Sequence, residues 1–233
     1  MLTGLAGFLW ITQPRTGTLQ DLSGLSGDVA RGETVFWAAG CASCHMAPKA
    51  TGAQQIVLAG GQKFASPFGS FLAPNISSDA AQGIGGWTLD NLAHALRDGV
   101  SPSGQHLFPA LPYSAYNKMA AQDLVDLKTF LDTLPASAEP SQPHQVGFPF
   151  NIRRSLGVWK LLFVSDAWVV DGDLSPEQTR GRSSVLPSTN VAKLLRSALL
   201  SDSPSCDSEN TSPLNFVFSK YRSRLVTSST VPT

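Results

Sequence analysis

Two cysteines and a histidine stand at a spacing that can attach a haem. The string is Cys41-Ala42-Ser43-Cys44-His45, and Cys-x-x-Cys-His is the attachment signature of c-type haem. Each thiol forms a thioether bond with one vinyl group of the porphyrin, and the following histidine is held beneath the iron as its proximal ligand. We therefore predict one covalent haem c on Cys41 and Cys44, with His45 as an iron ligand.

Two other chemistries use a Cys-x-x-Cys pair. A structural zinc site needs four ligands, but the third cysteine, Cys206, stands alone far downstream in a Ser-rich stretch. A thioredoxin-like dithiol would belong to a βαβ pattern, whereas here the motif follows a predicted helix. Haem attachment is the favoured interpretation, and zinc and dithiol chemistry remain the alternatives.

Three helices are predicted around this motif. The first spans residues 28–40, with Asp28 as its N-cap, and Gly40 ends it directly before the cysteines. The second spans 87–99, and the third spans Ala120 to Leu134, where leucines recur every three to four residues. Residues 47–86 are predicted to be loop-rich, and a proline-rich strap from Ser101 to Tyr116 is predicted to be extended. This order of elements predicts an all-α fold with a class I cytochrome c-like domain.

The second axial ligand of the iron should come from the segment before the last helix. Met119 is the favoured candidate, because Met1 lies outside the domain and Met46 directly follows His45 and cannot reach the opposite face of the iron. Met119 could also be an ordinary core residue at the start of the helix. His106 is the rival ligand, whereas His94 is expected on a helix face away from the iron.

Several further motifs accompany the haem signature in one order along the chain. They are Ala30-Arg31-Gly32-Glu33, Gly60-Gly61, Phe68-Gly69-Ser70-Phe71, Ala73-Pro74-Asn75-Ile76-Ser77, Gly83-Ile84-Gly85-Gly86-Trp87 and Phe108-Pro109-Ala110-Leu111-Pro112-Tyr113. Together they resemble the first haem domain of the multihaem cytochrome c subunits of membrane-bound alcohol, aldehyde and gluconate dehydrogenases, and the two-haem members most of all. The resemblance runs from about Ser26 to Arg182.

This resemblance implies an electron carrier and not an enzyme. Electrons would pass through the haem from the catalytic subunit of a periplasmic dehydrogenase toward an acceptor in the respiratory chain. The protein would then work in the bacterial periplasm, associated with the inner membrane. Many relatives have methionine where this chain has Leu111, and others keep the Lys-Met pair found here as Lys118-Met119, which supports Met119 as the ligand.

The resemblance also divides the chain. Residues 1–25 are expected to be a truncated remnant of an N-terminal anchor or signal, since the apolar run at the start is shorter than the roughly 20 residues that cross a bilayer. Residues 26–138 form the haem domain and 139–173 a connector. Residues 174–233 are predicted to begin a second cytochrome c domain that is disrupted.

The expected second Cys-x-x-Cys-His is missing from this last segment. Residues 183–233 carry 13 Ser and 5 Thr instead, and they are expected to lack a packed core. We hypothesise that the chain leaves the family's reading frame near Arg182. Translation of the gene in the other two frames tests this hypothesis, because one of them should restore a second haem motif.

Charge limits the kinds of partner. The chain has 17 Lys and Arg and 17 Asp and Glu, which argues against general nucleic-acid binding. Residues 1–140 hold 7 basic and 10 acidic residues, so the haem domain is mildly acidic. Two further functions stay open: a haem protein with an open iron site for ligand sensing or peroxidase-like chemistry, and a truncated subunit without independent activity.

Overall fold

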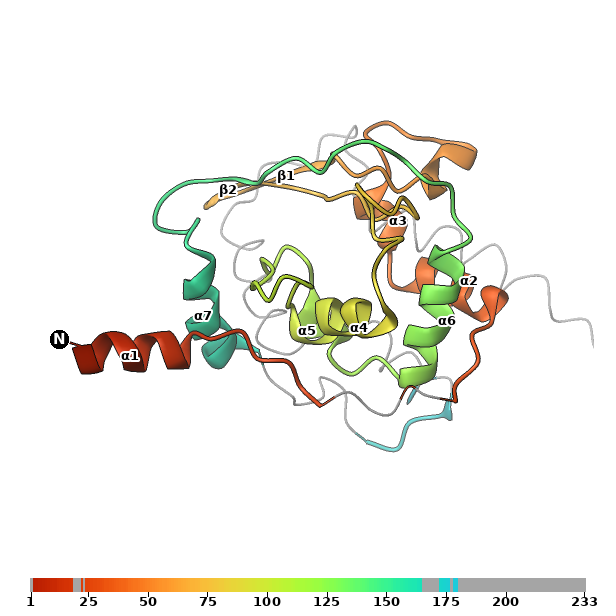
Figure 1. The fold of residues 1–233 in the computed structure, drawn as a ribbon. Helices are drawn as coiled ribbons and strands as arrows, with labels where there is room; N and C mark the ends of the chain where they lie inside the picture. The colour runs from red at the N-terminus through yellow and green to blue at the C-terminus, as the bar shows by residue number, and fades with distance from the viewer. Residues whose placement is uncertain (1, 19–21, 23, 165–171, 177, 180–233) are drawn as a thin grey trace, which may run out of the picture. The chain divides into compact units, whose positions relative to one another are not determined.

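The computed structural model describes residues 2–18, 22, 24–164, 172–176, 178 and 179. They fall within one compact unit, Met1–Arg196, whereas the second unit, Ser197–Thr233, lies outside the described residues. The Ser-rich tail and its proposed change of frame lie outside them too, as does most of the predicted second domain, residues 174–233. Figure 1 shows the elements, which are α1 (Leu2–Ile11), α2 (Val29–Ala38), α3 (Cys41–His45), η1 (Gly52–Ile56), β1 (Lys63–Ser66), β2 (Gly69–Leu72), α4 (Leu89–Asp98), α5 (Tyr113–Tyr116), α6 (Ala121–Leu131), β3 (Gln145–Val146), η2 (Arg153–Ser155) and α7 (Leu156–Phe163).

The three helices predicted around the motif are present, and their ends are where the capping residues place them. The Asp28 side chain accepts a hydrogen bond from the Arg31 amide at the start of α2. Thr88 and Asn91 form a reciprocal capping box at the start of α4, and Gly99 ends this helix in the left-handed conformation, with φ of 60°. The three predicted helices are thus confirmed.

Helices α2 and α6 cross at a glycine. A Cβ atom on Gly32 would lie 2.0 Å from the Asp126 carbonyl oxygen and 2.7 Å from the Phe130 Cβ, so only a residue without a side chain allows this approach. Next to the crossing, the Arg31 guanidinium donates to both oxygens of the Asp126 carboxylate at 2.7 and 2.9 Å. The crossing therefore combines close backbone packing with a bidentate ion pair.

A small antiparallel sheet lies where loop was predicted. Strands β1 and β2 pair with Lys63 opposite Leu72, and β3 pairs with β2 through Gly69 opposite Val146. A Cβ on Gly69 would lie 2.3 Å from the Gln145 carbonyl oxygen, which explains the glycine. The loop prediction is wrong for β1 and β2 because strands of four residues carry little periodic signal. The extended prediction is likewise wrong for the short helix α5.

The connector packs against the haem domain. The Asn75 side-chain amide donates to the backbone carbonyls of Ser137 and Glu139 at 2.8 and 2.7 Å. Further along, the Leu72 amide donates to the His144 Nδ1. Among the described residues, no helix has the length and apolar character needed to cross a membrane.

Candidate functional site

The haem motif forms its own short helix. Gly40 adopts a left-handed conformation, with φ of 71°, and breaks the chain between α2 and α3. The Ser43 hydroxyl then donates to the Gly40 carbonyl at 2.6 Å, which closes the first turn. Residues three apart on a helix share one face, so α3 presents Cys41 and Cys44 on the same side. Both are half-buried free thiols.

His45 is held in one tautomer by a backbone carbonyl. Its Nδ1 lies 2.9 Å from the Pro74 oxygen, and since a carbonyl only accepts, Nδ1 must carry the proton. The lone pair of Nε2 is then free to bind a metal, which is the usual arrangement of a metal-binding histidine. Burial lowers the pKa of His45 and outweighs the opposing effect of the Pro74 carbonyl, so the ring is neutral at pH 7.

A pair of glycines keeps that carbonyl in place. The Gly60 amide donates to the His45 carbonyl at 2.7 Å, and the Gly61 amide donates to the Ala73 carbonyl at 2.8 Å. Gly60 has φ of 75°, and a Cβ there would lie 2.5 Å from the Ala73 oxygen and from the Pro74 carbonyl carbon. The Gly60-Gly61 motif thus brings the Pro74 segment against the histidine.

Burial keeps the first thiol protonated. The pKa of Cys41 is raised to about 12, first by burial and then by the neighbouring charge of Cys44. A thiol of this kind is a poor thiolate nucleophile or metal ligand at neutral pH.

Met119 lies in the apolar core that also contains part of the motif. Its side chain is 1% exposed. The cluster of buried apolar residues to which it belongs includes Phe36, Ala42, Leu58, Ile84, Leu92, Leu124 and Leu127. Ala42 stands between the two cysteines, so the segment before α6 and the haem motif meet in one cluster.

A tyrosine three residues earlier ties this segment to the motif. The Tyr116 hydroxyl donates to the Ala39 carbonyl at 2.7 Å. Burial raises the pKa of this phenol, and the charges of Cys41 and Cys44 raise it further. Tyr116 therefore lies close to both thiols, a role that its sequence context did not reveal.

The other histidines lie elsewhere. His106 is buried, and its Nε2 donates to the Thr12 carbonyl at 3.0 Å, which places it beside the end of α1 and outside the apolar cluster around Met119. His94 lies on a face of α4, where its Nδ1 is 2.7 Å from an oxygen of Asp98.

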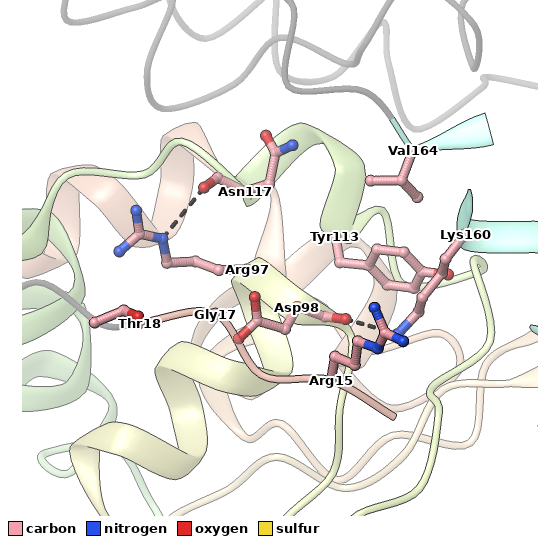
Figure 2. A pocket seen from close by; sticks show the side chains of 9 residues that line it. All are labelled: Arg15, Gly17, Thr18, Arg97, Asp98, Tyr113, Asn117, Lys160 and Val164. Atoms are coloured by element: carbon pink, nitrogen blue, oxygen red, sulfur yellow. Dashed lines mark hydrogen bonds between the residues drawn. The ribbon is translucent and has the colours of Figure 1, made fainter. Parts of the chain in front are cut away.

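A pocket with three cationic side chains lies next to α4, α5 and α7. It encloses about 270 Å³ and is lined by Arg15, Gly17, Thr18, Arg97, Asp98, Tyr113, Asn117, Lys160 and Val164. Figure 2 shows Arg97 and Asn117 at one end and Lys160 at the other. The Arg97 Nε donates to the Asn117 carbonyl at 3.2 Å, while its buried Nη1 has no hydrogen-bond partner among the described residues.

These residues fit a haem c. Two thiols share one helix face, a neutral imidazole has a free Nε2, and a buried thioether lies in the same apolar cluster as the motif. The Nη1 of Arg97 also suits the haem's carboxylate side chains, because Asn117 stands only two residues before Met119. Pro74 lies in a motif that the sequence analysis identified, but its contact with His45 could not be predicted from the sequence. The position of Arg97 could not be predicted either.

Comparison with known proteins gives a consistent result. The family model for cytochrome c matches residues 29–135. The chain is 50% identical over 182 residues to a diheme cytochrome c-type protein of Cereibacter sphaeroides, which covers 78% of this chain and 61% of that protein.

Two further relatives are subunits of dehydrogenases. The fructose dehydrogenase cytochrome subunit of Gluconobacter japonicus is 37% identical over 158 residues, covering 66% of this chain and 32% of the relative. The gluconate 2-dehydrogenase cytochrome c subunit of Pantoea cypripedii is 31% identical over 157 residues, covering 66% and 34%. The matched segment thus spans less than two thirds of each of these relatives.

Proposed function

We propose that this chain, whose residues 29–135 match the family model for cytochrome c, is a cytochrome c that carries electrons through a single haem c bonded to Cys41 and Cys44. The observation that carries the proposal is the His45 ring, whose Nδ1 proton is fixed on the Pro74 carbonyl so that Nε2 keeps the lone pair that can bind iron. When bound, the haem supplies a one-electron iron couple.

Four residues of this chain would attach the haem and bind its iron. Cys41 and Cys44 would hold the group covalently, and His45 would be one ligand of the iron. Met119 would supply a second, thioether ligand, which would raise the potential relative to a second histidine. His106 is not assigned this role, since its Nε2 is already bonded to the Thr12 carbonyl.

The surroundings keep water away from the site. The buried side chains of Phe36, Leu58 and Leu124 pack in the same cluster as Met119. With His45 and Met119 as its two ligands, the iron would have no open position for substrate. The bound haem would then supply electron transfer.

We further infer the electron's route from the relatives' names. The donor is the catalytic subunit of a periplasmic dehydrogenase, and the acceptor belongs to the respiratory chain. Two named relatives are cytochrome subunits of fructose and gluconate dehydrogenases, which supports such a donor. The protein would act in the periplasm at the inner membrane, with residues 26–138 as its haem domain, 139–173 as a connector and 174–233 as the start of a second domain.

An absorption spectrum tests the central assignment. The chain, loaded with haem in a periplasm, should show in its oxidised form the weak long-wavelength band of sulfur bound to iron. Met119→Ala should abolish the band, because the proposed thioether is removed. Met46→Ala is the matched control, since this residue adjoins His45 and should leave the band unchanged.

Two results would contradict the assignment. A band that survives in Met119→Ala would exclude Met119 as the ligand. A wild-type spectrum that is high-spin and binds carbon monoxide rapidly would show an open iron, and ligand sensing or peroxidase-like chemistry would then replace electron transfer.

A further inference from the structure

One peptide group joins the haem motif to the connector. Its carbonyl, that of Pro74, lies 2.9 Å from the His45 Nδ1. Its amide, that of Asn75, donates to the Ser141 hydroxyl at 3.0 Å. The bond between Pro74 and Asn75 is trans, so its C=O and N–H point in opposite directions. His45 and Ser141 therefore hold opposite edges of the same planar group.

The Asn75 side chain fixes this peptide group from the connector as well. Asn75 is only 3% exposed, and its side-chain nitrogen donates to the carbonyls of Ser137 and Glu139 at 2.8 and 2.7 Å. Its Oδ1 accepts a hydrogen bond from the Ser77 amide at 2.9 Å. A buried amide that uses its oxygen and both of its N–H groups is held in one orientation.

The connector is anchored again a few residues further on. The Leu72 amide donates to the His144 Nδ1 at 3.2 Å, and the His144 ring packs edge-on against Phe71 with 5.4 Å between ring centres. Strand β3 then pairs with β2. The segment from Ser137 to His144 is therefore held at both ends, and Ser141 is kept opposite the peptide group. Ser141 itself is exposed.

Two hydrogen bonds on one peptide group strengthen each other. Donation by the Asn75 amide to Ser141 draws electron density toward the Pro74 oxygen, and each bond in such a chain strengthens its neighbour by roughly 10–30%. The Pro74 oxygen is then a better acceptor for the Nδ1 proton of His45. A stronger outer partner makes a metal-binding histidine more basic, which stabilises oxidised iron more than reduced iron because the oxidised ion carries the larger charge.

We propose that Asn75 and Ser141 are positioning residues for the iron ligand His45, acting through the Pro74 peptide group, so that the connector helps to set the reduction potential of the haem. The proposal rests on the haem attachment and electron transfer proposed above. Ser141 lies beyond residues 29–135, which match the cytochrome c family model. The connector is thus part of the haem site and not only a link to the residues that follow.

The reduction potential of the haem-loaded 233-residue chain tests the proposal. Ser141→Ala should raise the ratio of reduced to oxidised haem, measured at the wild-type midpoint potential, about threefold, which is about 28 mV for a one-electron couple. The reason is that a weaker acceptor on His45 favours reduced iron. Ser141→Thr keeps the hydroxyl and should retain the wild-type potential.

A second serine of the connector provides the matched control. The Ser137 hydroxyl accepts a long hydrogen bond, 3.4 Å, from the Glu139 amide. Ser137→Ala removes this hydroxyl and leaves the Ser137 carbonyl, which accepts from Asn75, in place. The potential of this variant should equal that of wild type.

Exchange of the His45 Nδ1 proton with solvent is a second readout, measured by NMR on the haem-loaded chain. Ser141→Ala should speed this exchange about threefold, because the hydrogen bond to Pro74 is weakened. Asn75→Ala should speed it at least tenfold, because both bonds to the connector carbonyls are lost as well. If Asn75→Ala does not fold, the exposed Ser141 still decides the question.

Three outcomes would overturn the proposal. They are an unchanged potential in Ser141→Ala, an unchanged His45 proton exchange in that variant, and an equal shift of potential in Ser137→Ala. Failure of the proposed function is seen elsewhere, in a wild-type spectrum without the sulfur-to-iron band. The His45 proton exchange does not depend on Met119, so it still tests the contact with the connector in that case.

Discussion

Helices α6 and α7 are both rich in leucine, yet the leucines of α6 are buried whereas two leucines of α7 are exposed. In α6, Leu124, Leu127 and Leu131 are at most 3% exposed. In α7, Leu161 and Leu162 are more than 60% exposed. The difference does not come from residue type, but from whether another element covers the face. Helix α2 crosses α6, while among the described residues the outer face of α7 has no cover.

The polar contacts of the two regions differ in the same way. The buried Asp126 carboxylate joins α2 to α6 through Arg31, the Asp28 amide and Gln122. The polar contact to α1 is an exposed one, in which Arg154 of η2 donates to the Leu9 carbonyl. The crossing of α2 and α6 is thus specified by buried, mutually satisfied groups, whereas the polar contact between η2 and α1 is exposed and weaker.

The largest expected effect is a difference in stability between two glycine substitutions, one at the α2–α6 crossing and one in α1. Gly32→Ala should destabilise the protein by about 3 kcal/mol or more, because the new Cβ would collide with the backbone of α6. Gly7→Ala in α1 should change stability by less than about 1 kcal/mol, since nothing lies within 4 Å of its added Cβ. Denaturant unfolding of the two haem-loaded variants measures both. Equal effects would mean that the helix crossing is no more constrained than the free helix.

The next effect is the pH dependence of the protein's stability, which the Asp126 carboxylate produces. Burial alone would raise the pKa of Asp126, but the hydrogen bonds from Arg31, the Asp28 amide and Gln122 outweigh it and hold the pKa below its ordinary value. The carboxylate therefore stabilises the fold above about pH 4. This stabilisation is lost as the pH falls through the folded-state pKa, because the unfolded chain then binds more protons.

Asp126→Asn should therefore cost about 2 kcal/mol at pH 7. The gap between variant and wild type should narrow as the pH falls below 4, measured by denaturant unfolding from pH 7 to pH 3. Arg154→Gln, the control from η2, removes the exposed hydrogen bond to the Leu9 carbonyl and should cost less than about 1 kcal/mol at every pH. A gap that stays constant with pH would show that the Asp126 charge does not contribute.

Much of this architecture could be predicted from local sequence. Asp28, Thr88 and Gly99 mark helix ends because capping depends on residues within one turn, and the haem motif is likewise a string of neighbours. The contacts that could not be predicted are those between distant segments. The Pro74 carbonyl on His45, the β1–β2 hairpin and the α7 contact with α1 each depend on how loops meet in space, which no period in the sequence records.

The smallest expected effect is a difference in stability between substitutions of the two tyrosines of the short helix α5. The Tyr116 hydroxyl donates to the Ala39 carbonyl just before the haem motif, whereas the buried Tyr113 hydroxyl has no hydrogen-bond partner among the described residues. Tyr116→Phe should therefore cost about 1 kcal/mol, because a buried carbonyl loses its donor. Tyr113→Phe should cost nothing or stabilise slightly, because an unsatisfied hydroxyl leaves the interior. Denaturant unfolding compares the two directly, and a larger loss for Tyr113→Phe would mean that α5 is held from the α7 side, where Lys160 lies 4.8 Å from the Tyr113 ring centre, and not from the haem motif.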